Sequence, residues 1–391
     1  MEKSFSVSQF GFLPGRSAVQ QLLLFTEKLL EAKSVRGGVD VIYMDFRKAF
    51  DSVSHDGLLW KLYATGITGK LWSWLYSYLK HRSQCVRIGT SNSAFCKVLS
   101  GVPQGSVLGP LLFVIFINDL PRCIHSATPF IFADDTKCLL ASKSIRDNDK
   151  LQQDINNISI WSNASNLLFN ESKFVHIHFW QETSLDTPSY AINGNTIRQA
   201  SQHKDLGVTF SSDLHWTEHH KIITAKAYQT LGLLRCTFNV NRTVAKKQLY
   251  ISLVWSHLLY CSQLWRPQLL KDVFILERVQ WRATKYILNN YEQSYKERLE
   301  QLHLLPLMYT YELNDIIFFV KSLKSPADHF DIRRHVQFAE SSTRSGTSFK
   351  LVHVKSLQSS YHHFYFNRIV RLWNYLPVID ITLPTHTIKT N

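Results

Sequence analysis

The stretch Pro129-Phe-Ile-Phe-Ala-Asp-Asp-Thr-Lys-Cys-Leu-Leu140 places two adjacent carboxylates, Asp134 and Asp135, between two short apolar runs. Each run is typical of a β-strand, so the stretch predicts a hairpin with both acids at its tip. Neighbouring carboxylates repel each other, and a bound cation or a shifted pKa commonly offsets that repulsion. Taken alone, the pair fits either a metal site or an ordinary Asp-rich turn.

A second acidic segment, Val39-Asp-Val-Ile-Tyr-Met-Asp45, has the pattern of a buried strand that is entered through Gly37-Gly38 and ends at Asp45. If this strand lies beside the Asp134 hairpin, three carboxylates converge. Mg²⁺ takes carboxylate oxygens together with substrate phosphates, and two such ions about 4 Å apart can clamp the attacking and leaving oxygens of a phosphoryl transfer. The pattern therefore indicates nucleotidyl transfer.

Several ordered motifs resemble the reverse transcriptase family, and their variants are most similar to those of non-LTR retrotransposons of the long interspersed element type. The A, B and C motifs of that family resemble Asp45-Phe-x-x-Ala-Phe-Asp51, Ser100-Gly-Val-Pro-Gln-Gly-Ser-Val-Leu-Gly-Pro-Leu-Leu-Phe113 and Phe132-Ala-Asp-Asp135. Further similar segments are the one before motif A, motifs D and E, and a closing segment, at Gln9–Ser17, Asn170–Lys173, Lys204–Phe210 and Phe366–Pro377.

The resemblance implies catalytic roles for four residues. Asp45 and Asp134, with Asp135 nearby, would bind two Mg²⁺ ions, for which Mn²⁺ can substitute. Lys173 would be the general acid for the pyrophosphate leaving group, because an ammonium both donates a proton and stabilises developing charge. A solvated lysine remains an alternative for Lys173.

Four further residues are candidates for substrate binding. Phe50 occupies the position that the family uses as a steric gate against the ribose 2′-hydroxyl, although ordinary core packing is an alternative. Gln104 and Gly105 resemble the pair that faces the dNTP and the template. Arg16 is a weaker candidate for a contact to the template or to phosphates. We interpret Asp51 as structural, since it lies well past the end of the strand.

Composition supports a nucleic-acid partner. The chain has 391 residues, 45% of them hydrophobic, which is enough for a large core in two or three domains. The formal charge is +14, and residues 211–391, with 23 basic and 13 acidic residues, hold +10 of it. Such an excess favours a polyanion bound with salt-dependent affinity, or else a solubilising surface. The resemblance specifies an RNA template, a DNA primer and dNTP substrates.

Cysteine spacing and hydropathy indicate the compartment. The six cysteines show neither a C-x-x-C pair nor zinc-finger spacing, which is typical of a reducing environment, and the histidines, among them His176 and His178, form no evident ligand set. The most apolar run, Leu111 to Ile117, is far shorter than the roughly 20 residues that a membrane-spanning helix requires. We expect a soluble intracellular protein of the nucleus or cytoplasm, with no membrane partner.

The resemblance implies an α+β fold: a right-hand polymerase palm, in which helices pack on an antiparallel sheet, followed by a mostly helical thumb-like region. The expected domains are partial fingers at 1–40, the palm at 41–210, and a basic thumb and C-terminal region at 211–391. Apolar spacing predicts helices over Ala18–Ala32, Phe50–Tyr63, His220–Leu234, Val244–Trp265 and Lys271–Leu288.

The last of these helices carries a candidate nucleic-acid-binding stripe. Arg278, Arg282 and Lys285 recur at i, i+4 and i+7, so that their side chains share one face of the helix, where they can contact phosphates. A solvated face of an amphipathic helix gives the same pattern.

The family resemblance implies more of the fingers, and often an endonuclease, ahead of the Gln9 segment. We therefore expect a decayed or truncated fragment, or one part of a split gene model, that keeps the metal ligands, lacks the triphosphate grip, and is weakly active or inactive. The leading interpretation is an RNA-directed DNA polymerase domain of a non-LTR retrotransposon. A catalytically silent nucleic-acid-binding remnant and an RNA-dependent RNA polymerase are the alternatives.

Overall fold

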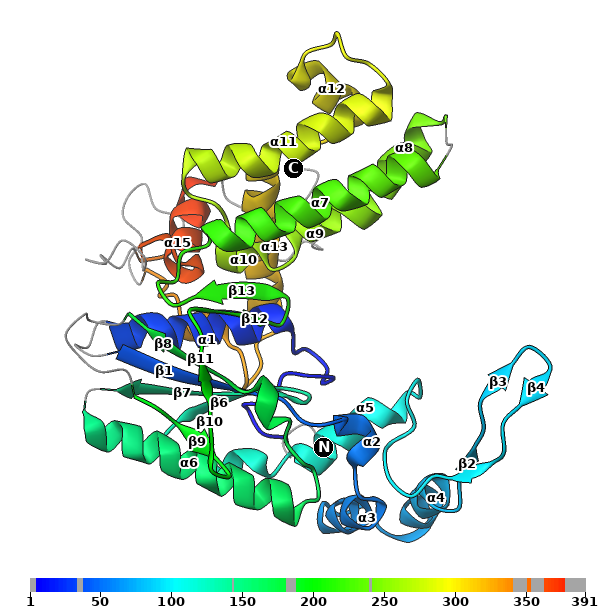
Figure 1. Ribbon diagram of the computed structural model, residues 1–391. Coiled ribbons are helices and arrows are strands. Elements are labelled where there is room, and N and C mark those ends of the chain that lie inside the picture. The colour runs from blue at the N-terminus through cyan, green and yellow to red at the C-terminus, as the bar shows by residue number, and fades with distance from the viewer. Residues whose placement is uncertain are drawn as a thin grey trace. The chain divides into compact units, whose positions relative to one another are not determined.

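The computed structural model describes residues 5–33, 38–142, 144–180, 188–238, 241–339, 350–352 and 362–376. Gly37 and Pro377, which belong to two of the sequence patterns, lie outside these ranges. The chain folds as two units, Met1–His203 and Lys204–Asn391. The first unit mixes helices with a sheet and the second is mostly helical (Figure 1). The expected combination of α and β structure is confirmed.

A five-stranded sheet forms the centre of the first unit. Its strand order is β11, β8, β1, β7, β6, and neighbouring strands are antiparallel except β11 and β8, which are parallel. The middle strand β1 is buried from its second residue onward, as its apolar sequence predicts. The five strands are β1 (Gly38–Met44), β6 (Thr128–Phe132), β7 (Asp135–Ser142), β8 (Val175–Phe179) and β11 (Arg198–Gln199).

Two long helices cover the two faces of this sheet (Figure 1). Helix α1 (Ala18–Lys33) matches the helix expected from the leucine spacing, and its Phe25 ring meets the Phe130 ring of β6 edge-on, with centroids 5.4 Å apart. Helix α6 (Ile145–Ala164) shares a core cluster with Ile42 of β1, on the other face. The sheet is thus fixed from both sides, which holds its strand ends in place.

Smaller elements complete the first unit. The helix expected over Phe50–Tyr63 is divided into α2 (Ala49–Ser52) and α3 (His55–Ala64), because Ser54 caps the second piece by accepting a bond from the Gly57 N–H at 3.2 Å. The others are helices α4 (Gly69–Leu79), α5 (Leu108–Ile117), η2 (Leu120–Cys123) and η3 (Glu171–Lys173), and strand pairs β2 (Ser83–Gln84) with β5 (Cys96–Lys97), β3 (Arg87–Ile88) with β4 (Ser91–Asn92), and β9 (Ala191–Ile192) with β10 (Asn195–Thr196).

The second unit begins within a short hairpin and continues as helices. The expected helix over Val244–Trp265 is interrupted, since Cys261 adopts a left-handed conformation with φ 55° and separates two helical pieces. The elements are strands β12 (Gln202–Asp205) and β13 (Val208–Ser211), and helices α7 (Thr217–Thr237), α8 (Thr243–Leu249), the π-helical turn η4 (Tyr250–Trp255), α9 (Ser256–Leu259), α10 (Ser262–Trp265), α11 (Leu270–Leu288), α12 (Tyr295–Leu302), α13 (Leu307–Lys324), η5 (Ile332–Arg334) and α15 (Tyr365–Tyr375).

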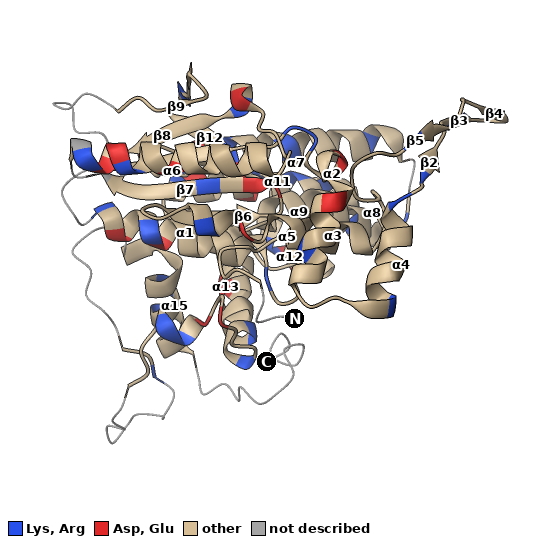
Figure 2. Ribbon diagram, turned by 90° about the horizontal axis from the view of Figure 1, so that it is seen from below, with Lys and Arg blue, Asp and Glu red and all other residues tan. Residues whose placement is uncertain are grey.

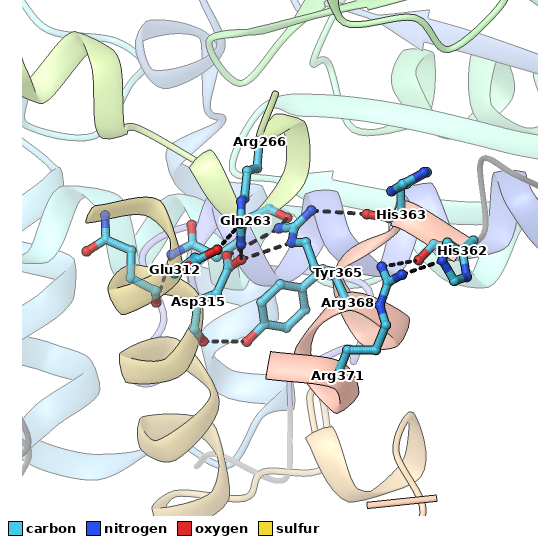
Figure 3. Close-up of polar contacts among 10 residues, drawn as sticks. Gln263, Arg266, Glu312, Asp315, His362, His363, Tyr365, Arg368 and Arg371 are labelled. Carbon is cyan, nitrogen blue, oxygen red and sulfur yellow. Dashed lines mark hydrogen bonds and ion pairs between the residues drawn. The ribbon is translucent and has the colours of Figure 1, made fainter. Parts of the chain in front are cut away.

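A buried ion network joins three helical segments of the second unit (Figure 3). Asp315 on α13 lies between two arginines, with its Oδ2 2.9 Å from Nε of Arg368 on α15 and 3.2 Å from Nη1 of Arg266, which follows α10. Arg266 also bonds Glu312 at 2.6 Å, and the Tyr365 hydroxyl donates to the Asp315 carbonyl at 2.9 Å. Asp315 is 1% exposed, so water cannot stabilise its negative charge. The two arginines compensate that charge instead.

Two expectations from composition can be compared with the structure. Within the described ranges, no helix combines the length and the apolarity that crossing a bilayer requires. All six cysteines are free thiols, as expected from their spacing, and Cys138 and Cys261 are the buried ones.

Candidate active site

The two adjacent acids lie at the tip of a hairpin, as the sequence predicts. Phe132 pairs with Asp135, so that Ala133 and Asp134 alone form the turn between β6 and β7. Ala133 has a φ of 56°, which reverses the chain within two residues. Asp134 is half-buried and Asp135, the first residue of β7, is exposed. Figure 2 shows acidic residues where β7 begins.

Asp45 joins these acids because β1 runs antiparallel to β7. Met44 pairs with Thr136, so Asp45 leaves β1 beside the start of β7. Burial raises the pKa of Asp134, and the nearby Asp45 charge raises it further, while Lys173 acts in the opposite direction. The structure thus brings Asp45 and Asp134 together from positions far apart in the sequence.

The three carboxylates form an open arrangement. The ligand oxygens of Asp45, Asp134 and Asp135 do not all lie within 4.8 Å of one another. Mg²⁺ is normally held by one or two carboxylates, waters and substrate phosphates rather than by a closed protein cage, and an open set of oxygens fits that requirement. Burial, and to a lesser extent the Asp45 charge, raise the pKa of Asp134, and a divalent cation would offset both effects by stabilising the ionised carboxylate.

Lys173 lies at the same acidic site. It ends the 3₁₀ turn η3, which is attached to the end of β1 by a hydrogen bond from Asn170 N–H to the Asp45 carbonyl at 2.8 Å. Its Nζ is 2.8 Å from Oδ2 of Asp45, and its side chain is 64% exposed. The hydrogen bond and charge of Asp45 raise the pKa of Lys173, so this ammonium keeps its proton at neutral pH.

Phe50 lies on α2, after the end of β1, and is half-buried. Its ring stacks on Phe113 of α5, with centroids 4.4 Å apart, and meets Phe12 edge-on at 6.1 Å. These two contacts fix the ring orientation, which a gate against a single hydroxyl group requires.

Gln104 and Gly105 lie in the loop before α5. Gln104 Nε2 donates to Oδ1 of Asp51 at 2.7 Å, a contact that sequence reasoning did not anticipate. Asp51 also accepts a bond at its carbonyl from Ser100 Oγ at 2.9 Å, so it connects the loop to α2, in agreement with a structural role. Gly105 has a φ of 76° and no atom within 4 Å of the place of a side chain, so its backbone is open to a ligand.

The segment before motif A is hydrogen-bonded to the turn that carries Asp134. Gln9, which sequence reasoning missed as a functional residue, accepts bonds from the backbone N–H groups of Ala133 and Gly11 at its Oε1, each at 2.8 Å. Arg16 directs its guanidinium to the carbonyl oxygens of Gln9 and Ser6, the latter at 2.6 Å. Arg16 therefore helps to hold its own loop.

The basic stripe lies on α11 of the second unit. Arg278 and Arg282 are exposed and Lys285 is half-buried. Lys285 Nζ lies 3.8 Å from the ring centroid of Trp281, and the Arg282 guanidinium carbon lies 4.9 Å from that of Tyr228. Part of the stripe is thus interleaved with aromatic side chains rather than surrounded only by solvent.

Two histidines do form a possible ligand set, which corrects the expectation from sequence. Within the described part of the chain, only one group of three or more His, Cys, Asp or Glu residues has its ligand atoms within 4.8 Å of one another. This group consists of Asp40, His176 and His178. Oδ1 of Asp40 is 2.6 Å from His176 Nε2 and 2.8 Å from His178 Nδ1. Burial opposes ionisation of Asp40, but these hydrogen bonds outweigh it and hold its pKa below 3.8.

Comparison with known proteins adds family relationships to this geometry. A family model described as "Reverse transcriptase (RNA-dependent DNA polymerase)" matches residues 1–210. A probable RNA-directed DNA polymerase from transposon BS of Drosophila melanogaster is 34% identical over 269 residues, 66% of this chain and 30% of the relative. The RNA-directed DNA polymerase from mobile element jockey of the same species is 30% identical over 227 residues, 56% and 24% of the two chains.

The chain thus spans less than a third of the length of these two curated relatives. Among solved structures, apo telomerase from Candida tropicalis has a TM-score of 0.45 and 12% identity, over 77% of this chain and 49% of that one. A likeness of this size supports no argument about the site.

Proposed function

The chain belongs to the reverse transcriptase (RNA-dependent DNA polymerase) family, and from this premise we propose that it is the RNA-directed DNA polymerase part of a non-LTR retrotransposon. One observation supports the proposal most directly: Asp45 and Asp134 meet at neighbouring strand ends, and burial with the charge of Asp45 raises the pKa of Asp134. The reaction would extend a DNA primer with dNTPs along an RNA template.

The proposed architecture assigns partial fingers to residues 1–40, the palm to 41–210 and the thumb and C-terminal region to 211–391. In this assignment the sheet is the rigid support of the palm, since α1 and α6 pack on its two faces. The basic residues Arg278, Arg282 and Lys285 on α11 would contact nucleic-acid phosphates, which would make binding strongly dependent on salt.

Asp45 and Asp134, with Asp135, are the residues that would hold two Mg²⁺ ions or Mn²⁺ in their place. Once bound, the ions would neutralise charge on the triphosphate and on the primer hydroxyl. Asp45 would turn its carboxylate from Lys173 toward the cation, which releases the Lys173 ammonium from the 2.8 Å contact. Lys173 would then give its proton to the leaving pyrophosphate oxygen, as the primer 3′-oxygen bonds the α-phosphorus and the bond from that phosphorus to pyrophosphate breaks. The proton of the primer hydroxyl would pass to water.

The remaining residues would position the substrate. The ring of Phe50, held by Phe113, would exclude a ribose 2′-hydroxyl. Gln104 has an amide that can exchange its bond to Asp51 for one to the substrate, and the open backbone of Gly105 permits close approach of a nucleotide. Arg16 would reach phosphates only after leaving the carbonyl oxygens that it now contacts.

Primer extension with dNTPs and with NTPs, in Mg²⁺ and in Mn²⁺, tests this function. We expect at most weak dNTP incorporation by the 391-residue chain, and a further loss of about 10²-fold or more in Asp134→Asn with unchanged nucleic-acid affinity. Asp56→Asn is the matched control, because Asp56 is an exposed acid on α3 that pairs with Lys80. Extension by Asp134→Asn at the parental rate would refute the metal assignment.

Two other outcomes of the same assay would identify the alternatives. A preference for NTPs over dNTPs would indicate an RNA-dependent RNA polymerase. Template–primer binding without extension, in the parent and in every variant, would indicate a catalytically silent nucleic-acid-binding remnant.

A further inference from the structure

A cavity between α7 and α11 combines positive charge with aromatic rings. It has a volume of about 450 Å³, within the range of small-ligand sites, and it lies wholly inside the second unit. Its lining includes three cations and no carboxylate. The lining residues that matter here are Tyr228, Arg235, Trp281, Arg282, Lys285 and Tyr291.

The aromatic side chains of this cavity are accessible. Trp281 on α11 is 39% exposed, and Tyr291, which follows that helix, is 62% exposed, although both are large aromatic groups. Trp281 is also held in place from within: the guanidinium carbon of Arg298 lies 5.8 Å from its ring centroid, and Arg298 itself is 1% exposed and bonds Thr284 Oγ1 at 3.1 Å. The indole therefore lies against a buried side chain and is still accessible from outside.

The cations of the cavity lie over these rings. Lys285 Nζ is 3.8 Å from the centroid of Trp281 and 5.7 Å from that of Tyr291, and Arg282 lies over Tyr228. A flat, uncharged heterocycle could replace the ammonium above the indole, since both are attracted to its π face. The displaced ammonium, with Arg235 and Arg282, would then be available for a phosphate.

We propose that this cavity binds a single unpaired nucleotide of an RNA or DNA strand, with its base stacked on Trp281 and its phosphate bound by Arg282 and Lys285. The proposal rests on the nucleic-acid partner of the proposed function and adds a site that reads strandedness. A base within a duplex offers only its edges, because its faces are covered by neighbouring base pairs, so the cavity favours single-stranded over double-stranded substrate. Stacking requires no sequence, since every base has a π face.

The test measures affinities of the full chain for a fluorescein-labelled single-stranded RNA of mixed sequence and for a duplex of the same length. We expect Trp281→Ala to weaken single-strand binding about tenfold and duplex binding by less than about twofold. Trp281→Phe, which keeps a ring, should restore most of the single-strand affinity. Phe274→Ala is the control, because Phe274 is 63% exposed on the same helix and does not line the cavity.

Tyr291→Ala provides a second variant at a more exposed position, in case Trp281→Ala unfolds. Single-strand affinities that stay at the parental value in both alanine variants would overturn the inference and leave the proposed function intact. Equal losses for single strand and duplex would also overturn it, since they indicate a general phosphate contact. A parent that binds neither nucleic acid would overturn the proposed function and the inference together.

Discussion

Replacing Gln9 by alanine is expected to damage both the fold and the acidic turn. Gln9 is 1% exposed, and its Oε1 accepts the N–H groups of Gly11 and Ala133, each at 2.8 Å. The chain segments are so close here that a side chain at Gly11 would put its Cβ 2.3 Å from the Ala133 nitrogen. A water molecule therefore has little room to replace the amide.

The size of the effect follows from these two bonds. A buried N–H that loses its acceptor costs about 1–3 kcal/mol, so Gln9→Ala should lower the free energy of unfolding by about 2–6 kcal/mol. That is a large fraction of the stability of a typical domain. Because Ala133 directly precedes Asp134, the turn should also shift, and a displacement of about 1 Å in a reacting group can reduce a rate about 10²-fold.

The assay is urea unfolding followed by circular dichroism, together with primer extension at matched folded concentration. Gln153→Ala is the control, because Gln153 is exposed on α6 and its amide bonds the Asn157 side chain at 3.1 Å. The control should change stability by less than about 0.5 kcal/mol. If Gln9→Ala unfolds at the parental urea concentration and extends primers at the parental rate, the hydrogen bonds of Gln9 do not hold the turn at Asp134 in place.

Three further predictions follow from other parts of the structure. Phe50→Val should admit ribonucleotides, measured as the ratio of dNTP to NTP incorporation, and an unchanged ratio would remove Phe50 from the gate. Asp315→Ala should lower the free energy of unfolding by about 3–5 kcal/mol, since it leaves Arg368 buried without a carboxylate and Arg266 with Glu312 alone, and a parental urea midpoint would contradict this. Against the effect of burial, hydrogen bonds from His176 and His178 hold the pKa of Asp40 below the usual value of an aspartic acid, so its contribution to stability is present above the unfolded pKa and is lost as the pH falls through the folded pKa. The difference in urea midpoint between the parent and Asp40→Asn should therefore be full at pH 6 and shrink below about pH 4, and a difference independent of pH would argue against the shift.

Local patterns predicted the elements that carry the acids. The strand that ends before Asp45 and the hairpin around Asp134 are both confirmed, because buried apolar runs and a two-residue turn are properties of short segments. The sequence alone did not predict that the two segments lie side by side, since the pairing of Met44 with Thr136 joins residues far apart in the chain. The resemblance to the family motifs indicated that these acids belong to one site, which the apolar and polar pattern alone could not do.

Side-chain directions were not predictable from the sequence. The bond between Gln104 and Asp51, and the fold of Arg16 onto its own loop, depend on tertiary geometry that no periodicity encodes. The spacing of His176 and His178 could have indicated a pair of ligands, since residues two apart on a strand share a face of the sheet. It still required the register of β8 against β1, which sets His178 opposite Asp40. Similarly, neither glycine nor proline marks the break at Cys261.

The buried Asp315 network links the stability of the second unit to its C-terminal helix. A premature stop codon or frameshift ahead of α15 would delete Arg368 and Tyr365 and leave the buried Asp315 carboxyl of α13 with one arginine fewer. The unit would then lose packing around α10 and α13, which carry none of the acidic residues of the candidate active site. In a gene that encodes this chain, a late truncation of the reading frame would therefore lower the amount of folded product through misfolding and proteolysis, even where every codon of the candidate active site is intact.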